Sequence, residues 1–393
     1  MVDEIVHSVD PEGDVLLVLR NPKAPFAIWD DSDWASQTEN AKKSKKPRKR
    51  EMVMRMKEMH PEGPSEAELA PSFQNTNIEQ EPEVKFILSS RHLILASRYF
   101  NAKLNGTWKE ATPHAFDNRH HMEASDWDPD ALLILMHAIH GRTRSVPRRI
   151  DCEMLAKIAV LVDYYDCHEV VEVFSSMWID ALKDQIPSEC NRDLLLWLCI
   201  AHVFKQDDAF AKITKTAILE GKGPMPTVDL PIPPIVIDSI NWRRQDTIRF
   251  ILDALNDVRA SLLKSPQGSD HASSCMNLGA LDRAMYKEEL PELSEPYLGR
   301  GVTHLEAIVR GFESPAWNSY DHYNSDGRSY RSASYRLSSI IVQRLGSKSD
   351  KNKEGFTLAE VAGSDVSRRE GKGKDSEDAP ELSGGTELSV PET

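Results

Sequence analysis

The side chains in this sequence that are best suited to chemistry are histidines and cysteines, and they occur in small groups. Three groups stand out: His120-His121, His137-Ala-Ile-His140 and Cys167-His168. Imidazole nitrogens and thiolates are the usual ligands of zinc, which needs three or four of them at suitable spacing. The histidine groups lack cysteine or carboxylate partners at ligand spacing, and Cys167-His168 has no second pair nearby. We therefore expect core or surface roles for these side chains and no metal site.

Sequence motifs of catalysis and cofactor binding are absent. The chain contains no Gly-rich phosphate loop, no Gly-x-Ser-x-Gly nucleophile turn and no His-Glu-x-x-His zinc motif. No catalytic residue, cofactor or small-molecule substrate is therefore expected. An enzyme would need a polar pocket with perturbed ionisable groups, built from residues far apart in the sequence.

Composition and charge narrow the class of protein further. The chain has 393 residues, 40% of them hydrophobic, which is enough for one large or two ordinary domains. Its net charge of -14 disfavours general binding to nucleic acid, because the phosphates would be repelled.

Five unclustered cysteines indicate reduced thiols in an intracellular protein. The longest apolar run, Leu194 to Ala201, is far shorter than the roughly 20 residues of a membrane helix. We expect a soluble protein of the nucleus, the cytoplasm or both, without a membrane segment.

One short segment is strongly basic in an otherwise acidic chain. Residues 42–50 hold seven basic side chains in nine positions: Lys42, Lys43, Lys45, Lys46, Arg48, Lys49 and Arg50. An extended cluster of this kind can act as a nuclear-import signal, because acidic pockets on a carrier take alternate side chains. A solvated charge run is the competing interpretation. Contact with nucleic acid is not favoured, because no aromatic residues interleave the charges for base stacking.

The clearest structural pattern is a strand that leads directly into a helix at residues 84–104. Val84, Phe86 and Leu88 alternate as in a half-buried strand, and Ser89 or Ser90 can cap the following helix. Five residues then repeat at helical spacing and predict one buried face: Leu93, Ala96, Ser97, Phe100 and Leu104. Nothing in this segment indicates catalysis.

This segment resembles the start of a BTB/POZ domain. In that family a short strand leads to a helix with leucine, serine and phenylalanine at its fourth, seventh and tenth steps, places held here by Ile94, Ser97 and Phe100. Ser90 stands where the family usually has histidine, a form that is similar to BTB proteins of filamentous fungi. The resemblance implies an interaction module without catalytic residues, and therefore a protein that binds other proteins.

The resemblance also implies a partner strand upstream. Residues 14–19, Asp-Val-Leu-Leu-Val-Leu, resemble the first strand of the family and would form a hairpin with Val84–Leu88. The intervening residues 20–83 are rich in Pro, Lys, Glu and Ser, whereas ordinary strand connections take only about 4–6 residues. We therefore predict a disordered basic insertion at 20–83 that is looped out of the domain.

Two sets of residues become candidate binding sites through the resemblance. Many BTB domains dimerise through the face that contains the first helix, so the candidates for self-association are Leu93, Leu95, Tyr99 and Phe100. Burial in the domain's own core is the competing explanation for Leu93 and Phe100. Trp108 and Glu110 stand where some BTB adaptors carry a hydrophobic-x-Glu motif that docks a cullin scaffold. A packed Trp108 with a surface Glu110 is the alternative to cullin docking.

The rest of the chain is predicted to be helical and then disordered. A strand is expected at 113–122, followed by a helix that Asp128 caps, with Pro129 at its first position and Gly141 after its end. Further helices are expected at 151–166, 168–184, 192–204, 207–220, 235–264, 275–285 and 301–310. Residues 311–345 are rich in Ser and Tyr and end in a short helix. Residues 346–393 hold one aromatic side chain and should be disordered.

These patterns predict an α+β protein. A BTB/POZ fold, a small sheet flanked by helices, would occupy residues 8–185, and an α-helical extension 186–310 would precede the segment 311–345 and the tail 346–393. The predicted function is non-enzymatic protein–protein interaction, as a scaffold or adaptor, through homo- or hetero-dimerisation of the BTB domain in nuclear regulation. The alternative is a substrate adaptor of a cullin-based ubiquitin ligase. Cullin binding would favour the adaptor, whereas nuclear accumulation that depends on residues 42–50 would favour the regulator.

Overall fold

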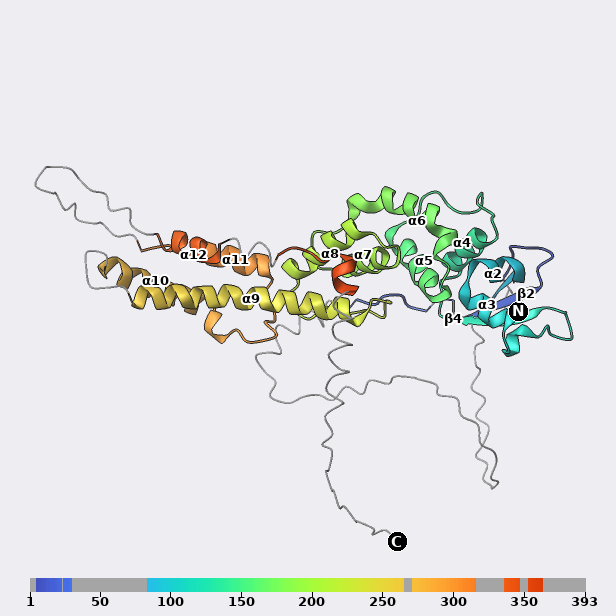
Figure 1. Cartoon of the computed structure of the whole chain (residues 1–393), viewed down its shortest axis with the longest axis horizontal. Coiled ribbons are helices and arrows are strands. Elements are labelled where there is room, and N and C mark those ends of the chain that lie inside the picture. Colours follow the sequence, from blue (N-terminus) through green and yellow to red (C-terminus); the bar gives the residue numbers. More distant parts are fainter. Residues whose placement is uncertain are drawn as a thin grey trace, which may run out of the picture. The chain divides into compact units, whose positions relative to one another are not determined.

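The structure, a computed structural model, describes residues 5–22, 24–29, 83–264, 271–315, 336–346 and 353–362 (Figure 1). This described part is mixed α/β, with a small four-stranded sheet and many helices. Among these residues, no helix is long and apolar enough to cross a membrane. Most of the predicted insertion, including the basic cluster at 42–50, lies outside the described residues, so these residues and the import signal stay predictions. The predicted start of the insertion was wrong, because Arg20 is the last residue of a sheet strand and the Asn21 side chain donates to Oδ1 of Asp126 at 2.6 Å.

Contacts within the chain divide the described residues into two compact units. The first unit comprises those of 1–148 and 161–174, and the second comprises those of 149–160 and 175–393. The division passes through two helices and does not coincide with the predicted limits of 8–185 and 186–310, which stay predictions.

The sheet of the first unit is built on a hairpin. Strand β2 (Val15–Arg20) runs antiparallel to β3 (Val84–Leu88), with Val15 opposite Leu88, which confirms the predicted pairing. The hairpin lies between β1 (Ile5–Ser8), parallel to β3, and β4 (His120–Ser125), parallel to β2, in the order β1-β3-β2-β4. Alternation along β2 and β3 buries one face of the hairpin: Val15, Leu17, Leu19, Val84, Phe86 and Leu88.

Strand β4 begins at His120, later than the sequence predicts. The residues before it close a tight loop, because the His114 N–H donates to the Arg119 carbonyl at 2.7 Å and the Asn118 N–H donates to the His114 carbonyl at 2.9 Å. Asn118 has a φ of 55°, a left-handed conformation that a regular strand does not contain. The predicted strand was therefore wrong for residues 113–119.

The single helix expected at 90–104 is two helices, α2 (Ser90–Ala96) and α3 (Arg98–Asn105), because Ser97 between them is extended. The Ser97 hydroxyl oxygen accepts from the Phe100 N–H at 3.1 Å and so caps α3, while the hydroxyl donates to the Tyr165 carbonyl. The predicted buried face is kept across the break by Leu93, Ser97, Phe100 and Leu104. A one-turn helix, η1 (Lys109–Ala111), follows α3.

Helix α4 (Pro129–Ile139) begins and ends as the sequence predicts. The Asp128 side chain accepts from the N–H groups of Asp130 and Ala131, both at 3.0 Å, and Pro129 is the first helical residue. Gly141 follows the helix at a φ of 66°. The next helices are α5 (Cys152–Tyr165), α6 (His168–Leu182) and the one-turn η2 (Lys183–Gln185). The predicted buried face of α5 is confirmed: Leu155, Ile158, Ala159, Val162 and Tyr165.

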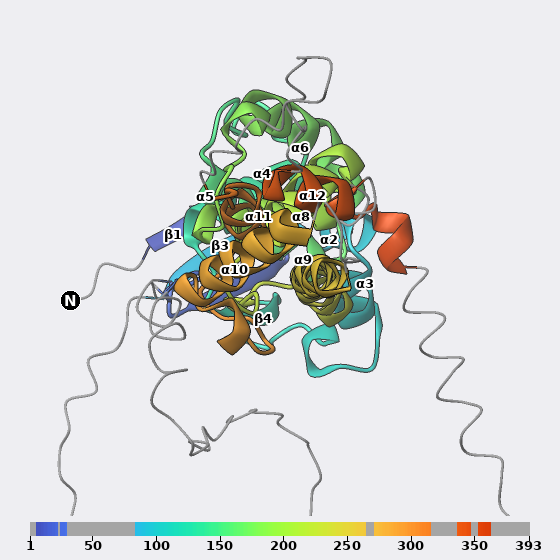
Figure 2. The same ribbon diagram turned by 90° about the vertical axis from the view of Figure 1, so that its left-hand side faces the viewer.

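The second unit is helical in its described part beyond α6. Its elements are α7 (Arg192–Val203), α8 (Asp207–Glu220), α9 (Pro234–Leu263), α10 (His271–Lys287), η3 (Leu290–Glu292), α11 (Val302–Arg310) and α12 (Leu337–Leu345). Helix α7 is buried nearly all round, which accounts for its continuous apolar run. The long helix α9 packs against α10, α11 and α12 (Figures 1 and 2). One apolar core joins them, and its members include Ile251, Leu255, Leu281, Leu305 and Ile341.

Residues 353–362 differ from the expectation that the chain is disordered from 346 onward. Phe356 is buried, its N–H donates to the Thr214 hydroxyl of α8 at 2.9 Å, and the Arg243 guanidinium lies 4.5 Å from its ring centroid. Gly355 lies so close to the Ala211 carbonyl that an added Cβ would stand 1.8 Å from the oxygen. The prediction of disorder was wrong here because these contacts come from helices more than a hundred positions earlier in the chain.

Candidate functional site

The four candidates for self-association divide into core and surface. Leu93 and Phe100 are fully buried, which favours the competing explanation for these two residues, a place in the domain's own core. Leu95 is 89% exposed, and Tyr99 is half-buried. The helical pattern places Leu93 and Phe100 on the inner face of α2 and α3, which leaves only Leu95 and Tyr99 accessible.

Tyr99 belongs to a cluster of aromatic side chains in the first unit. Its ring centroid lies 5.2 Å from that of Tyr164, and the Tyr164 ring lies 5.2 Å from that of Trp127. Tyr164 is 50% exposed, whereas the next residue, Tyr165, is buried and stacks on Phe100 at 4.8 Å. The inner rings therefore form a rigid support, and the outer rings form part of the surface.

A second group of side chains lies at the end of α3, and the charge of its member Glu110 acts on Tyr99. The Lys103 ammonium lies 4.0 Å from the Trp108 ring centroid and 3.6 Å from Oε1 of Glu110. Trp108 remains 53% exposed. Gly106 allows the chain to turn tightly between α3 and Trp108. A Cβ atom added to Gly106 would stand 2.3 Å from the Ala102 carbonyl oxygen.

We call this surface the aromatic face, defined by Tyr99, Trp108, Glu110, Trp127 and Tyr164. Burial, together with a hydrogen bond to the Tyr164 side chain, raises the pKa of Tyr99 well above its ordinary value. Tyr99 therefore stays protonated at neutral pH. Aromatic side chains with one polar edge suit protein–protein contact, because they bury a large area on binding at a small cost in side-chain entropy.

Sequence reasoning found Tyr99, Trp108 and Glu110 but missed Trp127 and Tyr164. Tyr164 stands on α5 beside residues that match a buried helical face, and Trp127 precedes the cap of α4. No local pattern connects either residue to α3. For Tyr164 the available signal was a large aromatic residue at a position that the helical periodicity of α5 leaves outside the core.

His140 and Cys167, which belong to the other two groups of possible metal ligands in the sequence, have structural roles. Nε2 of His140 accepts from the Ser89 N–H at 2.9 Å, and its Nδ1 donates to the Met136 carbonyl at 2.8 Å, which fixes a neutral tautomer. Burial lowers the pKa of His137 and of His140. Burial raises the pKa of Cys167 to about 12, so its thiol is unreactive at neutral pH.

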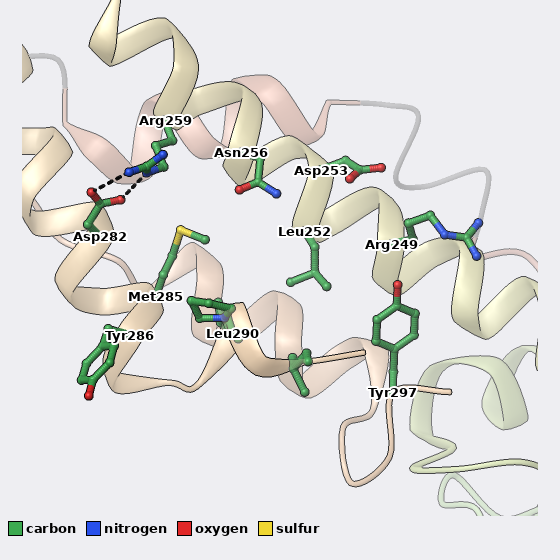
Figure 3. Close-up of a pocket in the computed structure, with 12 residues that line it drawn as sticks. Arg249, Leu252, Asp253, Asn256, Arg259, Asp282, Met285, Tyr286, Leu290 and Tyr297 are labelled. Carbon is green, nitrogen blue, oxygen red and sulfur yellow. Dashed lines mark hydrogen bonds and ion pairs between the residues drawn. The ribbon is translucent and has the colours of Figure 1, made fainter. Parts of the chain in front are cut away.

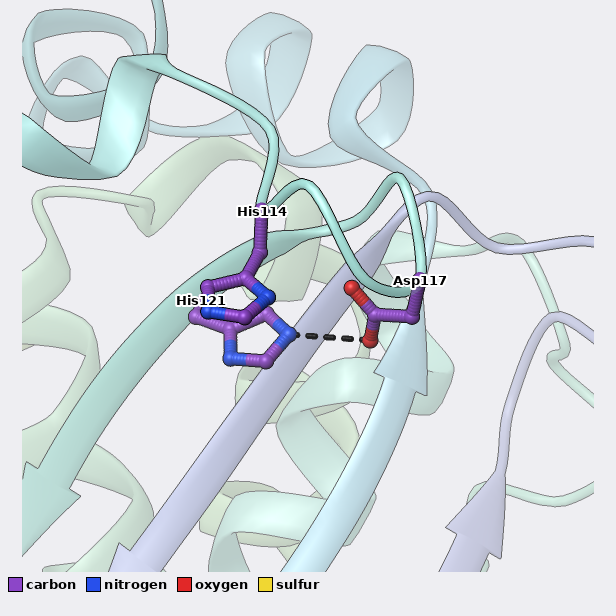
Figure 4. A group of neighbouring side chains, drawn as sticks. All are labelled: His114, Asp117 and His121. Atoms are coloured by element: carbon purple, nitrogen blue, oxygen red, sulfur yellow. Dashed lines mark hydrogen bonds and ion pairs between the residues drawn. The ribbon is translucent and has the colours of Figure 1, made fainter.

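His121 contradicts the expectation that it lacks a carboxylate partner. Its Nε2 lies 2.9 Å from Oδ2 of Asp117, and the ring of His114 stacks on its ring with centroids 4.7 Å apart (Figure 4). A hydrogen bond from His121 lowers the pKa of Asp117. Sequence reasoning paired His121 with its neighbour His120 and overlooked His114 and Asp117, which the loop before β4 brings together.

A cleft of about 610 Å³ lies in the second unit between α9, α10 and η3 (Figure 3). Its charged groups include Arg249, which bonds to Glu295, and Arg259, whose Nε donates to Asp282 at 2.7 Å. These hydrogen bonds raise the pKa of both arginines, further from neutral pH. Leu252, Met285 and Leu290 line the rest with apolar surface. Both arginines are thus held in ion pairs, and the apolar side chains belong to the core that packs α9 against α10.

No protein-family model matches the chain, and no curated protein and no solved structure matches it.

Proposed function

We propose that this protein is a non-enzymatic interaction module of the BTB/POZ type that binds a second copy of itself, or a related domain, through the aromatic face. The β2–β3 hairpin that leads into α2 and α3, and the helices that follow, support the family assignment. In this proposal the protein acts as a scaffold or adaptor and needs no cofactor.

The observation that carries the proposal is the half-exposed aromatic cluster on a rigid support. Trp108 and Tyr164 each keep about half of their surface exposed, while Phe100 and Tyr165 beneath the cluster are buried. Such aromatic side chains, held in one orientation by a packed layer, are the residues that dominate binding energy in protein interfaces. A group of exposed large aromatic side chains is typical of a protein interaction site.

Sedimentation equilibrium of the full chain from low to high micromolar concentration tests self-association. We expect a dimer, and we expect Trp108→Ala and Tyr164→Ala each to weaken it about 30-fold or more, the effect of losing about 2 kcal/mol. Tyr286→Ala is the matched control, because Tyr286 is a 78% exposed aromatic residue of α10 in the other unit. A strict monomer at high micromolar concentration would contradict the proposal, as would a dimer that both variants leave intact.

The second candidate function is a substrate adaptor of a cullin-based ubiquitin ligase. The exposure of Trp108 favours it, because a docking motif must present its apolar residue to the scaffold. Glu110, however, already pairs with Lys103, and a partner would have to compete for that carboxylate. Co-purification of a cullin that Trp108→Ala and Glu110→Lys abolish would support the adaptor, whereas unchanged co-purification would exclude this motif.

A nuclear role depends on residues that lie outside the described part of the chain. We keep the import signal as a proposal and test it by changing Lys45, Lys46, Arg48 and Lys49 to Ala together. Loss of nuclear accumulation in cells would support nuclear regulation. Unchanged accumulation would contradict a role of this cluster in import.

A further inference from the structure

Three potential metal ligands meet on the surface of the first unit. One donor atom from each of His114, Asp117 and His121 can be chosen so that all three lie within 4.8 Å of one another. The two imidazole rings are nearly parallel, at 16°, and the Asp117 carboxylate faces their edge (Figure 4). His114 and His121 are exposed and Asp117 is half-buried, so an ion from solution can reach them.

The backbone of the loop holds this arrangement. His114 and Arg119 are joined by a hydrogen bond of 2.7 Å between their backbone groups, which places His114 back beside the start of β4. Arg119 is anchored in turn, because its Nε donates to the Gly13 carbonyl at 3.1 Å. Oδ1 of Asp117 accepts from the Arg119 N–H at 3.2 Å, which leaves Oδ2 directed at His121.

The strand then separates His121 from its neighbour. Successive residues of a strand point to opposite faces, so His120 and His121 diverge. Nδ1 of His120 lies 2.9 Å from the Glu110 carbonyl oxygen, while His121 lies beside His114 and Asp117. His120 is thus a natural control for a neighbouring imidazole outside the cluster.

We propose that His114, Asp117 and His121 bind a divalent transition-metal ion, with zinc as the typical case. Two imidazole nitrogens and one carboxylate oxygen are ligands that zinc accepts, with water completing the coordination. Tetrahedral bonds of about 2.0–2.1 Å would place the donor atoms about 3.3 Å apart. The distance of 2.9 Å between His121 and Asp117 is already near that spacing, and rotation of exposed side chains closes the rest.

The bound ion would join the loop to the edge strand β4. The loop also carries Phe116, which is 93% exposed, and a metal would fix how this side chain is presented. Mg²⁺ and Ca²⁺ are not expected to bind, because they prefer sites made of oxygen ligands.

Isothermal titration of the full chain, without a histidine tag, with ZnCl₂ tests the proposal. We expect one zinc ion per chain at this site, and we expect His114→Ala, Asp117→Ala and His121→Ala each to weaken its binding at least tenfold. His120→Ala should leave it unchanged. So should His271→Ala, which removes the imidazole 3.7 Å from the Cys275 sulfur and controls for zinc bound there. Circular dichroism should be the same for all variants, because the substituted cluster is at the surface.

Three outcomes would overturn the proposal. The first is a wild-type chain that does not bind zinc. The second is a His114→Ala/His121→Ala double variant that binds zinc as tightly as the wild type. The third is MgCl₂ binding to the same site with the affinity of zinc, which would rule out imidazole as the deciding ligand.

Discussion

The carboxylate of Asp14 receives two hydrogen bonds from Ser90, a residue 76 positions later in the chain: the Ser90 N–H donates to Oδ1 at 2.7 Å and its hydroxyl donates to Oδ2 at 2.6 Å. Ser89, the N-cap residue of α2, makes no side-chain cap. Asp14 therefore takes the place of the local cap and ties the start of α2 to the start of β2. Burial disfavours the ionised carboxylate, but the bonds from Ser90 outweigh it and lower the pKa of Asp14.

Removing the hydrogen bonds between Asp14 and Ser90 should destabilise the first unit. We expect Asp14→Ala to lower the free energy of unfolding by about 2 kcal/mol and Ser90→Ala by about 1 kcal/mol, since the latter keeps the backbone bond. The double variant should lose less than the sum of the two, because both changes break the same interaction. Urea unfolding followed by circular dichroism measures this, with the exposed Glu12→Ala as control. Strict additivity would contradict the coupling.

Stability should fall on mild acidification, and His140 should contribute to the fall. Burial lowers the folded-state pKa of His140 below its ordinary value of 6.5, so the neutral ring is favoured in the folded state. The stability that the neutral His140 ring contributes is complete above pH 6.5. It is lost as the pH falls toward the lower pKa of the folded state, because the unfolded chain binds the proton at a higher pH than the folded chain does. Thermal unfolding across this range should show a smaller pH dependence for His140→Gln than for the wild type. Equal pH dependence would contradict the assignment.

Substitution of Arg244 should strongly destabilise the second unit. It is 1% exposed and donates to the carbonyls of Gly221, Pro296, Tyr297 and Arg300. Burial lowers the pKa of Arg244 to about 10, so the guanidinium is still charged at neutral pH.

We therefore expect Arg244→Met to cost about 3 kcal/mol or more, because several buried carbonyls lose their donor. Arg244→Lys should rescue only part of the loss, since one ammonium cannot reach the same set of acceptors. Arg259→Lys, in the exposed pair with Asp282, should change stability by about 1 kcal/mol or less. Calorimetric melting temperatures rank the three variants, and an equal effect of Arg244→Lys and Arg259→Lys would refute the prediction.

Phe356→Ala should release residues 353–362 from α8 without unfolding the unit. Phe356 supplies the buried ring and the N–H that bonds to Thr214, but it belongs to a short segment at the edge of the fold. Gly355→Ala should act in the same way, because its methyl group would collide with the Ala211 carbonyl.

Hydrogen–deuterium exchange measures the release as faster exchange of the backbone amides at positions 356 and 358, which bond to Thr214 and Asp207 in the wild type. Glu354→Ala is the control, since Glu354 is an exposed neighbour in the same segment. Wild-type exchange rates in both Phe356→Ala and Gly355→Ala would show that these contacts do not hold the segment.

One cysteine of the five should react fast with a thiol reagent under native conditions. Burial raises the pKa of Cys152, Cys167 and Cys190 to about 12 in each case, and Cys199 is buried in α7. Cys275 is exposed on α10. A colorimetric titration at pH 8 should give one rapid thiol, none in Cys275→Ser, and five in denaturant for the wild type. A second rapid thiol in the native protein would contradict the prediction that the other four are protected, two of them by full burial and two by partial burial.

The sequence determined those elements whose signals are local. The alternation at Val84, Phe86 and Leu88 predicts β3, and the Asp128-Pro129 start with Gly141 at the end predicts α4, because strand period, capping and glycine geometry act within a few residues. The partner strand β2 was also predictable, since its apolar run is long enough to need burial on a sheet.

The tertiary structure decided everything that depends on residues distant in the chain. Ser97 breaks the expected helix because the Tyr165 carbonyl accepts its hydroxyl, and α2 is capped by Asp14 and His140 instead of by its own serine. The aromatic face, the His114–Asp117–His121 cluster and the attachment of Phe356 likewise exist only in the folded chain. The physical reason is the same in each case: a side chain's partners are set by distance in space, whereas periodicity and capping rules describe only its neighbours in sequence.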